Sequence, residues 1–261
     1  MKTIPLIGVL AMVCYASSAL SGTGMEAQER LVKDMPLQPF FHSHHPWQLK
    51  IYQPIGQDAE MGDNPVRVCF VGPMDAKAPE VQCNALVGGS FPKGQPVPLQ
   101  TLDSVDLEML PSSNDPAGRP SIVVRATFWG GGPGLLKGLF VWADTSTDHR
   151  QGQFMQTFKS DITQAGEQRF LKQGPLAGAF VAVDQVYEGN EPNMASPVRY
   201  DMRIYEPAPL GYVEVLSTLS KKRYPSNHTG DGLPDAIGTL TSEMSGALKA
   251  VYPTGVSELL R

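Results

Sequence analysis

The sequence predicts an all-β fold of repeated antiparallel β-meanders, completed by a C-terminal α-helix. Three observations favour this class. Residues 120–220 contain two similar units, each made of short apolar segments joined by turns. Glycine and proline number 26 and 23, a level that suits a turn-rich β protein and falls short of the content typical of disorder. Apolar residues recur at helical spacing near the C-terminus, after these units end.

The two units correspond along their length. Val123 matches Val181, Trp129 matches Tyr187, and Gly152 matches Gly211, at nearly constant spacing. Repeated meanders of this size are compatible with propeller-like blades, and an irregular sandwich or an open array of antiparallel sheets explains them equally. We therefore predict the meander repeat and leave its higher arrangement open.

The first residues predict an export signal. Lys2 precedes an apolar run over residues 4–16, and the small residues Ser17, Ser18 and Ala19 follow it. Residues 1–19 are therefore interpreted as a cleaved signal peptide. The apolar run is shorter than the roughly 20 residues of a transmembrane helix. We expect a periplasmic or secreted protein whose mature chain has no integral membrane segment.

The mature chain is expected to begin with a lead segment over residues 20–44, followed by a single β-rich domain over residues 45–261. Within the lead, residues 26–35 are interpreted as a short helix before several prolines interrupt the chain. From Trp47 onward, apolar and polar residues alternate, as in a half-buried strand. Residues 102–110 are assigned to a strand rather than a helix because prolines lie nearby.

Cys69 and Cys83 are predicted to form a disulfide bond. Each lies in a strand-like segment, and a turn-like segment separates them. If the two strands pair as a hairpin, the two side chains lie within bonding reach in an oxidising compartment. Two buried thiols or a metal pair are the alternatives, and the absence of ligand-spaced partners disfavours a metal.

The C-terminal helix is expected at about residues 235–252. Its apolar stripe is formed by Ile237, Leu240, Met244, Leu248 and Val251, at spacings of three and four. Pro234 suits the first position of a helix. Since two glycines lower its intrinsic helicity, we expect the helix to dock against the sheets.

No residue pattern indicates catalysis, a cofactor or a metal. The net charge is −5, which argues against a nucleic-acid partner because such proteins carry a basic surface. Residues 130–134 are rich in glycine but lack the Lys-Ser/Thr pair of a phosphate-binding loop. His42, His44 and His45 form a cluster, interpreted as a solvated loop rather than a metal site.

Trp129 and Tyr187 are the candidate binding residues. Both end a predicted strand and precede a glycine-containing loop. Core packing is one explanation, and contact with a partner at a loop rim is the other, since aromatic residues dominate interfaces. The favoured function is an exported, non-enzymatic binding protein that presents loops to a protein partner, such as an inhibitor or immunity-type protein of an envelope enzyme. The alternative is a periplasmic or secreted hydrolase whose carboxylates meet only in the fold.

Overall fold

The computed structural model describes most of the chain beyond the predicted signal peptide. The described residues are 29–55, 64–90, 96–112, 115–129, 135–172, 176–186, 188, 196–225, 233 and 235–251. The predicted signal peptide and the glycine-rich segment 130–134 lie outside them. Tyr187 also lies outside the described residues. Among the helices that are described, none combines the length and the apolar character needed to cross a membrane.

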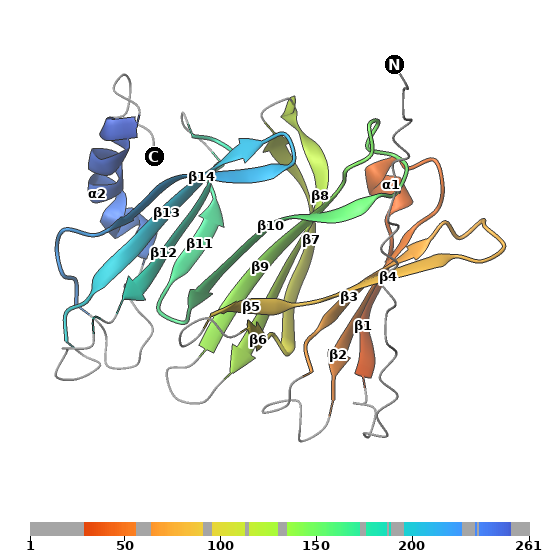
Figure 1. Ribbon diagram of the computed structural model, residues 1–261, viewed down its shortest axis with the longest axis horizontal. Helices are drawn as coiled ribbons and strands as arrows, with labels where there is room; N and C mark the ends of the chain where they lie inside the picture. Colours follow the sequence, from red (N-terminus) through yellow and green to blue (C-terminus); the bar gives the residue numbers. More distant parts are fainter. Residues whose placement is uncertain are drawn as a thin grey trace, which may run out of the picture.

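Three four-stranded antiparallel sheets follow one another along the chain, and each is a meander (Figure 1). The N-terminal sheet has the order β1-β2-β3-β4. Its strands are β1 (Glu29–Pro36), β2 (Gln48–Pro54), β3 (Arg67–Gly72) and β4 (Glu80–Ala85). The short helix α1 (Gln38–Phe41) connects β1 to β2.

The central sheet has the order β10-β9-β8-β7. Its strands are β7 (Thr101–Ser112), β8 (Asp115–Trp129), β9 (Leu135–Asp144) and β10 (Phe154–Thr163). A small two-stranded sheet precedes it, formed by β5 (Val87–Ser90) and β6 (Pro96–Pro98). The assignment of residues 102–110 to a strand is confirmed by β7.

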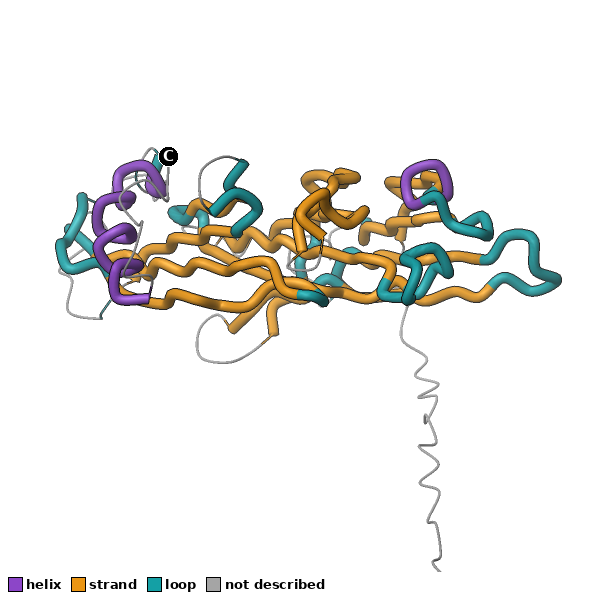
Figure 2. The backbone as a smooth tube through the Cα atoms, turned by 90° about the horizontal axis from the view of Figure 1, so that it is seen from above, coloured by secondary structure: helices purple, strands orange, loops and turns teal. Residues whose placement is uncertain are grey.

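The C-terminal sheet has the order β11-β12-β13-β14. Its strands are β11 (Glu167–Phe170), β12 (Phe180–Val186), β13 (Arg199–Ala208) and β14 (Gly211–Leu219). The helix α2 (Ala236–Val251) follows, close to the predicted bounds. The view from above in Figure 2 shows α2 at one end of an elongated molecule.

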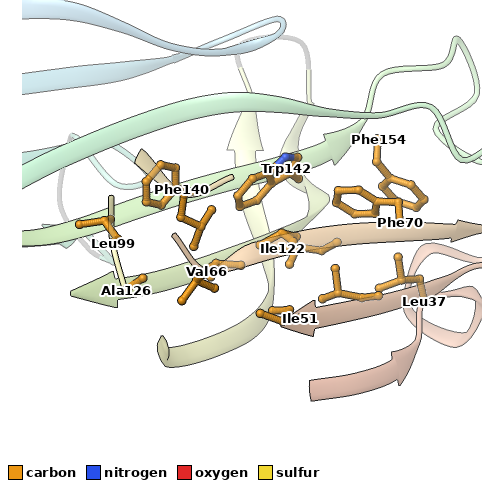
Figure 3. Packing of buried hydrophobic residues seen from close by; sticks show 14 of the residues in the cluster. Leu37, Ile51, Val66, Phe70, Leu99, Ile122, Ala126, Phe140, Trp142 and Phe154 are labelled. Carbon is orange, nitrogen blue, oxygen red and sulfur yellow. The ribbon is translucent and has the colours of Figure 1, made fainter. Parts of the chain in front are cut away.

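Both faces of the central sheet are buried, because neighbouring residues along its strands point alternately into two different hydrophobic clusters. Ile122 and Val124 of β8 belong to a hydrophobic cluster shared with the inner face of the N-terminal sheet, which includes Ile51 and Phe70 (Figure 3). Val123, between them in the sequence, belongs to a different cluster shared with the C-terminal sheet. Because successive side chains point to opposite faces of a strand, the central sheet separates two hydrophobic layers.

The C-terminal sheet repeats this arrangement one layer further along. Phe180 of β12 faces the central sheet and packs edge-to-face on Phe158 of β10, with ring centroids 4.9 Å apart. The neighbouring Val181 lies in a third cluster that includes Leu240 and Leu248 of α2. The predicted docking of the helix on the sheets is therefore confirmed.

The predicted repeat corresponds to the central and C-terminal meanders. Val123 and Val181, the matched valines, both face the layer that follows their own sheet in the chain. The matched glycines both adopt positive φ angles, 81° at Gly152, just before β10, and 127° at Gly211, the first residue of β14. A side chain at Gly152 would also collide with Trp47, whose Nε1 lies 2.1 Å from an ideal Cβ position. These shared requirements explain the similarity of the two units.

The all-β class with a C-terminal helix is confirmed. The described sheets form an open row and no closed barrel (Figure 1). Within each sheet the up-and-down order is that of a propeller blade, while the sheets share hydrophobic layers as in a sandwich. The open array among the predicted alternatives fits this arrangement best.

The predicted helix over residues 26–35 is wrong, because the described part of this segment forms β1. Its residues pair antiparallel with β2, placing Asp34 opposite Lys50. The Lys50 ammonium and the Asp34 carboxylate are 2.9 Å apart. Cross-strand pairing supplies contacts that an isolated short helix lacks, so tertiary structure overrides the weak local preference.

The Cys69–Cys83 disulfide is present and links β3 to β4. The two cysteines are direct cross-strand partners in the antiparallel register. Cys69 is 1% exposed, while the residues of β4 are largely exposed. The predicted disulfide within a hairpin is therefore confirmed, and the hairpin joins a buried strand to an exposed edge strand.

Candidate functional site: the outer edge of the central sheet

Trp129 lies at the exposed end of β8. Its side chain is 51% exposed, whereas Val123, on the same face of the strand, is completely buried. Arg125 and Thr127, between them on this face, have intermediate exposure. Neighbouring elements therefore cover this face less at Trp129 than at Val123, and the indole is available for contact with another molecule.

A groove lies near the opposite end of β8, where the central and C-terminal sheets meet. Its volume is about 680 Å³, within the range of pockets that hold small ligands or peptide segments. The lining residues come from the end of β7, from the connection between β11 and β12, and from the end of β13. They are Glu108, Met109, Leu110, Pro111, Phe170, Leu171, Lys172, Leu176, Ala177, Gly178, Ala179, Glu206 and Pro207.

The groove runs along strand edges rather than over one face of a sheet. Four successive residues of β7, from Glu108 to Pro111, line it. The register between β7 and β8 shifts between Leu110 and Ser112, so the regular alternation of side chains between the two faces is interrupted at this end of β7. In the order of the central sheet, β7 is the last strand, and no described strand pairs with its outer edge. The groove therefore lies beside an open sheet edge.

Charged groups of both signs surround the groove. Glu108 of β7 and Glu206 of β13 contribute carboxylates, and Lys172 contributes an ammonium group. Glu108 is only weakly neutralised, since its Oε1 lies 3.9 Å from Nη2 of Arg125. Arg125 makes its closer ion pair with Asp106, at 2.6 Å. The lining is therefore acidic on balance.

A buried hydroxyl lies next to the groove. Leu110 and Pro111 also line a second cavity of about 20 Å³, together with Tyr212 and Arg119. The Tyr212 hydroxyl is buried and makes no hydrogen bond to the described part of the chain. Burial, aided by the negative charge of Glu108, raises the pKa of Tyr212, so this hydroxyl stays protonated as a donor. Arg119 donates from Nη2 to the carbonyl of Pro209 at 2.6 Å and fixes the β13–β14 turn over the central sheet.

Two members of the histidine cluster form hydrogen bonds with carboxylates that are distant in sequence. His44 Nε2 lies 2.9 Å from Asp148 Oδ2, and His45 Nδ1 lies 3.0 Å from Asp75 Oδ2. All four side chains are about half exposed. No group of three metal-ligating residues gathers within the described ranges. These histidines therefore join loops.

Two carboxyl groups with raised pKa values face each other between β12 and β13, where Asp184 is paired with Asp201. Burial raises the pKa of both. Asp184 accepts hydrogen bonds from Thr163 N at 2.8 Å, Thr163 Oγ1 at 2.5 Å and Gln185 N at 2.9 Å. These bonds hold β12 to the end of β10, so Asp184 has a structural role.

Sequence reasoning selected Trp129 and did not select Glu108, Lys172 or Glu206. Glu108 comes from the central meander and the other two from the C-terminal meander, and none belongs to a local motif, so only the stacking of the sheets brings them to one groove. Trp129 and the groove belong to opposite ends of β8, and Tyr187 is outside the described residues. The prediction that Trp129 and Tyr187 act together therefore stays a prediction.

Comparison with known proteins identifies no relatives. No protein-family model matches the chain, and neither the curated proteins nor the solved structures yield a significant match.

Proposed function

We propose that this chain is an exported, non-enzymatic binding protein that holds a protein partner at the end of the central sheet where Trp129 is exposed. The observation that carries the proposal is the half-exposed indole of Trp129 at the end of β8. A large aromatic ring exposed at a strand end is a typical interface anchor, because it buries much apolar area at small entropic cost.

The disulfide supports the exported location. Disulfides persist in oxidising compartments and are rare in the cytosol, and Cys69–Cys83 joins the strands of a largely exposed hairpin. This bond and the predicted signal peptide together support a periplasmic or secreted site of action. An inhibitor or immunity-type role for this chain, with an envelope enzyme as its partner, is the expected form of this function, since such a role needs a rigid surface and no chemistry.

Substitution of Trp129 by alanine tests the proposal. We expect the free energy of unfolding to change by less than about 0.5 kcal/mol, since the side chain is half exposed. Affinity for the partner isolated from the native envelope fraction should fall by about 2 kcal/mol or more, roughly thirtyfold. Denaturant melts and titration with the purified partner measure the two quantities.

Met155→Ala is the matched control, because Met155 is 58% exposed on β10. This variant should leave both stability and partner affinity unchanged. If Trp129→Ala instead lowers the free energy of unfolding by several kcal/mol, the ring is part of the packed core and the proposal is contradicted.

A hydrolase is the second candidate, and one observation favours it. Glu108 and Glu206 come from different sheets and line the same groove, as two carboxylates of a glycosidase do. Release of reducing sugars from purified cell-wall polysaccharide measures this activity. Turnover that disappears in both Glu108→Gln and Glu206→Gln would replace the binding proposal, whereas turnover equal to a protein-free blank excludes this substrate class.

A further inference from the structure

We propose that the groove beside β7 binds an extended segment of the partner protein that carries a lysine or arginine side chain. The inference rests on the proposed binding function and specifies where and how a segment of the partner is held. It joins three features of the groove: an open strand edge, an acidic lining and an apolar wall.

The open edge supplies hydrogen bonds to an extended backbone. No described strand pairs with the outer edge of β7, and the groove follows this edge from Glu108 to Pro111. An added peptide strand gains affinity from main-chain hydrogen bonds to such an edge, and alternate side chains provide specificity. Pro111 lacks an N–H group, so pairing is limited to the residues before it.

The charge of the lining selects a basic side chain. Glu108 and Glu206 supply two carboxylates against the single ammonium of Lys172. The nearest cation to Glu108, Arg125, is 3.9 Å away and is engaged more closely by Asp106. A lysine or arginine of the bound segment would provide Glu108 with a closer partner, and charge-assisted hydrogen bonds are stronger than neutral ones.

The remaining lining is mainly aliphatic and suits the apolar side chains of a peptide. Met109, Leu110, Leu171 and Leu176 surround the groove, and Phe170 is its only aromatic residue among those described. A few polar groups within an apolar lining fix the orientation of a ligand. A strongly polar glycan would leave this wall without partners, so the lining favours a peptide over a sugar chain.

The groove and Trp129 lie toward opposite ends of the central sheet. Glu108 is the cross-strand partner of Ser121, whereas Trp129 is the last residue of β8. Near the Trp129 end of β7, the backbone N–H of Leu102 donates to Gln53 Oε1 at 3.1 Å. The groove is therefore a contact separate from Trp129.

Selection from a displayed random peptide library on the immobilised mature protein tests the inference. We expect the selected peptides to be enriched in lysine and arginine and to bind as synthetic peptides in solution. The double variant Glu108→Gln/Glu206→Gln should weaken the best synthetic peptide by about tenfold or more. N-methylation of alternate peptide amides should weaken it similarly, because it removes the donors used in strand addition.

Glu80→Gln is the control, since it removes one carboxylate from the exposed edge strand β4. This variant should bind the peptide normally, and thermal melts verify that the Gln variants remain folded. If the double variant is destabilised, the single variant Glu108→Gln replaces it in the binding measurement. Failure to select peptides, selection without basic residues, or binding unaffected by Glu108→Gln overturns the inference. Partner binding that is lost in Trp129→Ala yet unchanged in Glu108→Gln would overturn the groove site alone and leave the proposed function standing.

Discussion

The two outer sheets meet their surroundings in different ways. The outer face of the C-terminal sheet is apolar and is covered by α2, whose Leu240, Met244 and Leu248 are completely buried. The outer face of the N-terminal sheet bears ion pairs instead. Lys50 pairs with Asp34, and Arg67 donates from Nε to Glu29 at 2.8 Å while lying over the ring of Tyr52.

The difference shows how a row of repeated units ends. Each internal layer offers an apolar face to its neighbour, so the terminal units need either a covering element or a polar surface. The C-terminal sheet has the covering helix, and the N-terminal sheet has the polar surface together with a covalent link between β3 and β4. Stability should therefore depend on packing at one end and on local links at the other.

Removing apolar volume from the helix should have the largest effect. Leu240→Ala or Leu248→Ala is expected to lower the free energy of unfolding by about 2–5 kcal/mol, because each side chain is fully buried between α2 and the C-terminal sheet. Equilibrium denaturation measures the change. Ser242→Ala on the exposed side of α2 is the control, and losses below about 0.5 kcal/mol at both leucines would contradict a docked helix.

Removing the disulfide should have the next largest effect. The bond closes a loop with a sequence separation of 14, so the double variant Cys69→Ala/Cys83→Ala should lose about 3 kcal/mol in the chain-entropy model. Alkylation followed by intact-mass analysis checks the bond in the exported protein. Two alkyl groups should be added only after reduction, and full labelling without reductant would show that both thiols are free.

Breaking an ion pair on the outer face of the N-terminal sheet should have a smaller effect. Arg67 is partly exposed and pairs with Glu29, so Arg67→Ala should cost about 0.2–1 kcal/mol, because solvent screens such pairs. The matched double variant with Glu29→Ala isolates the pair energy. A loss as large as that of Leu240→Ala would mean that this face is packed in the same way as the C-terminal one.

Local sequence patterns predicted much of the fold because the burial of one face of a strand or helix sets the spacing of apolar residues within that same segment. Alternation around Ile51 and Val68 gave β2 and β3, and the helical stripe around Leu240 gave α2. The strand β1 was missed since its stability comes from pairing with β2, which its own residues do not reveal. The groove was missed for the same reason, because Glu108 and Glu206 meet only through the stacking of two sheets.

The smallest expected effect is a loss of stability in acid at the loops beside the N-terminal sheet. His45 binds Asp75 in the β3–β4 loop, and His44 binds Asp148 in the β9–β10 loop. These hydrogen bonds are the main reason that the pKa values of both carboxyls lie below their ordinary value of 3.8.

A carboxyl whose pKa is lower in the folded state than in the unfolded state contributes its full stabilisation when the pH is above the unfolded-state pKa. The stabilisation from Asp75 and Asp148 is therefore complete above about pH 4. It is lost as the pH falls through the pKa values that these two carboxyls have in the folded state, which are lower. Chemical denaturation between about pH 6 and pH 2.5 should show this decline, and Asp75→Asn/Asp148→Asn should reduce it. Glu80→Gln, at an exposed carboxyl on β4, should leave the decline unchanged. An acid limb identical in the double Asn variant and the unmodified protein would mean that these two loop contacts add nothing to stability, leaving the disulfide and the strand pairing to hold the N-terminal end.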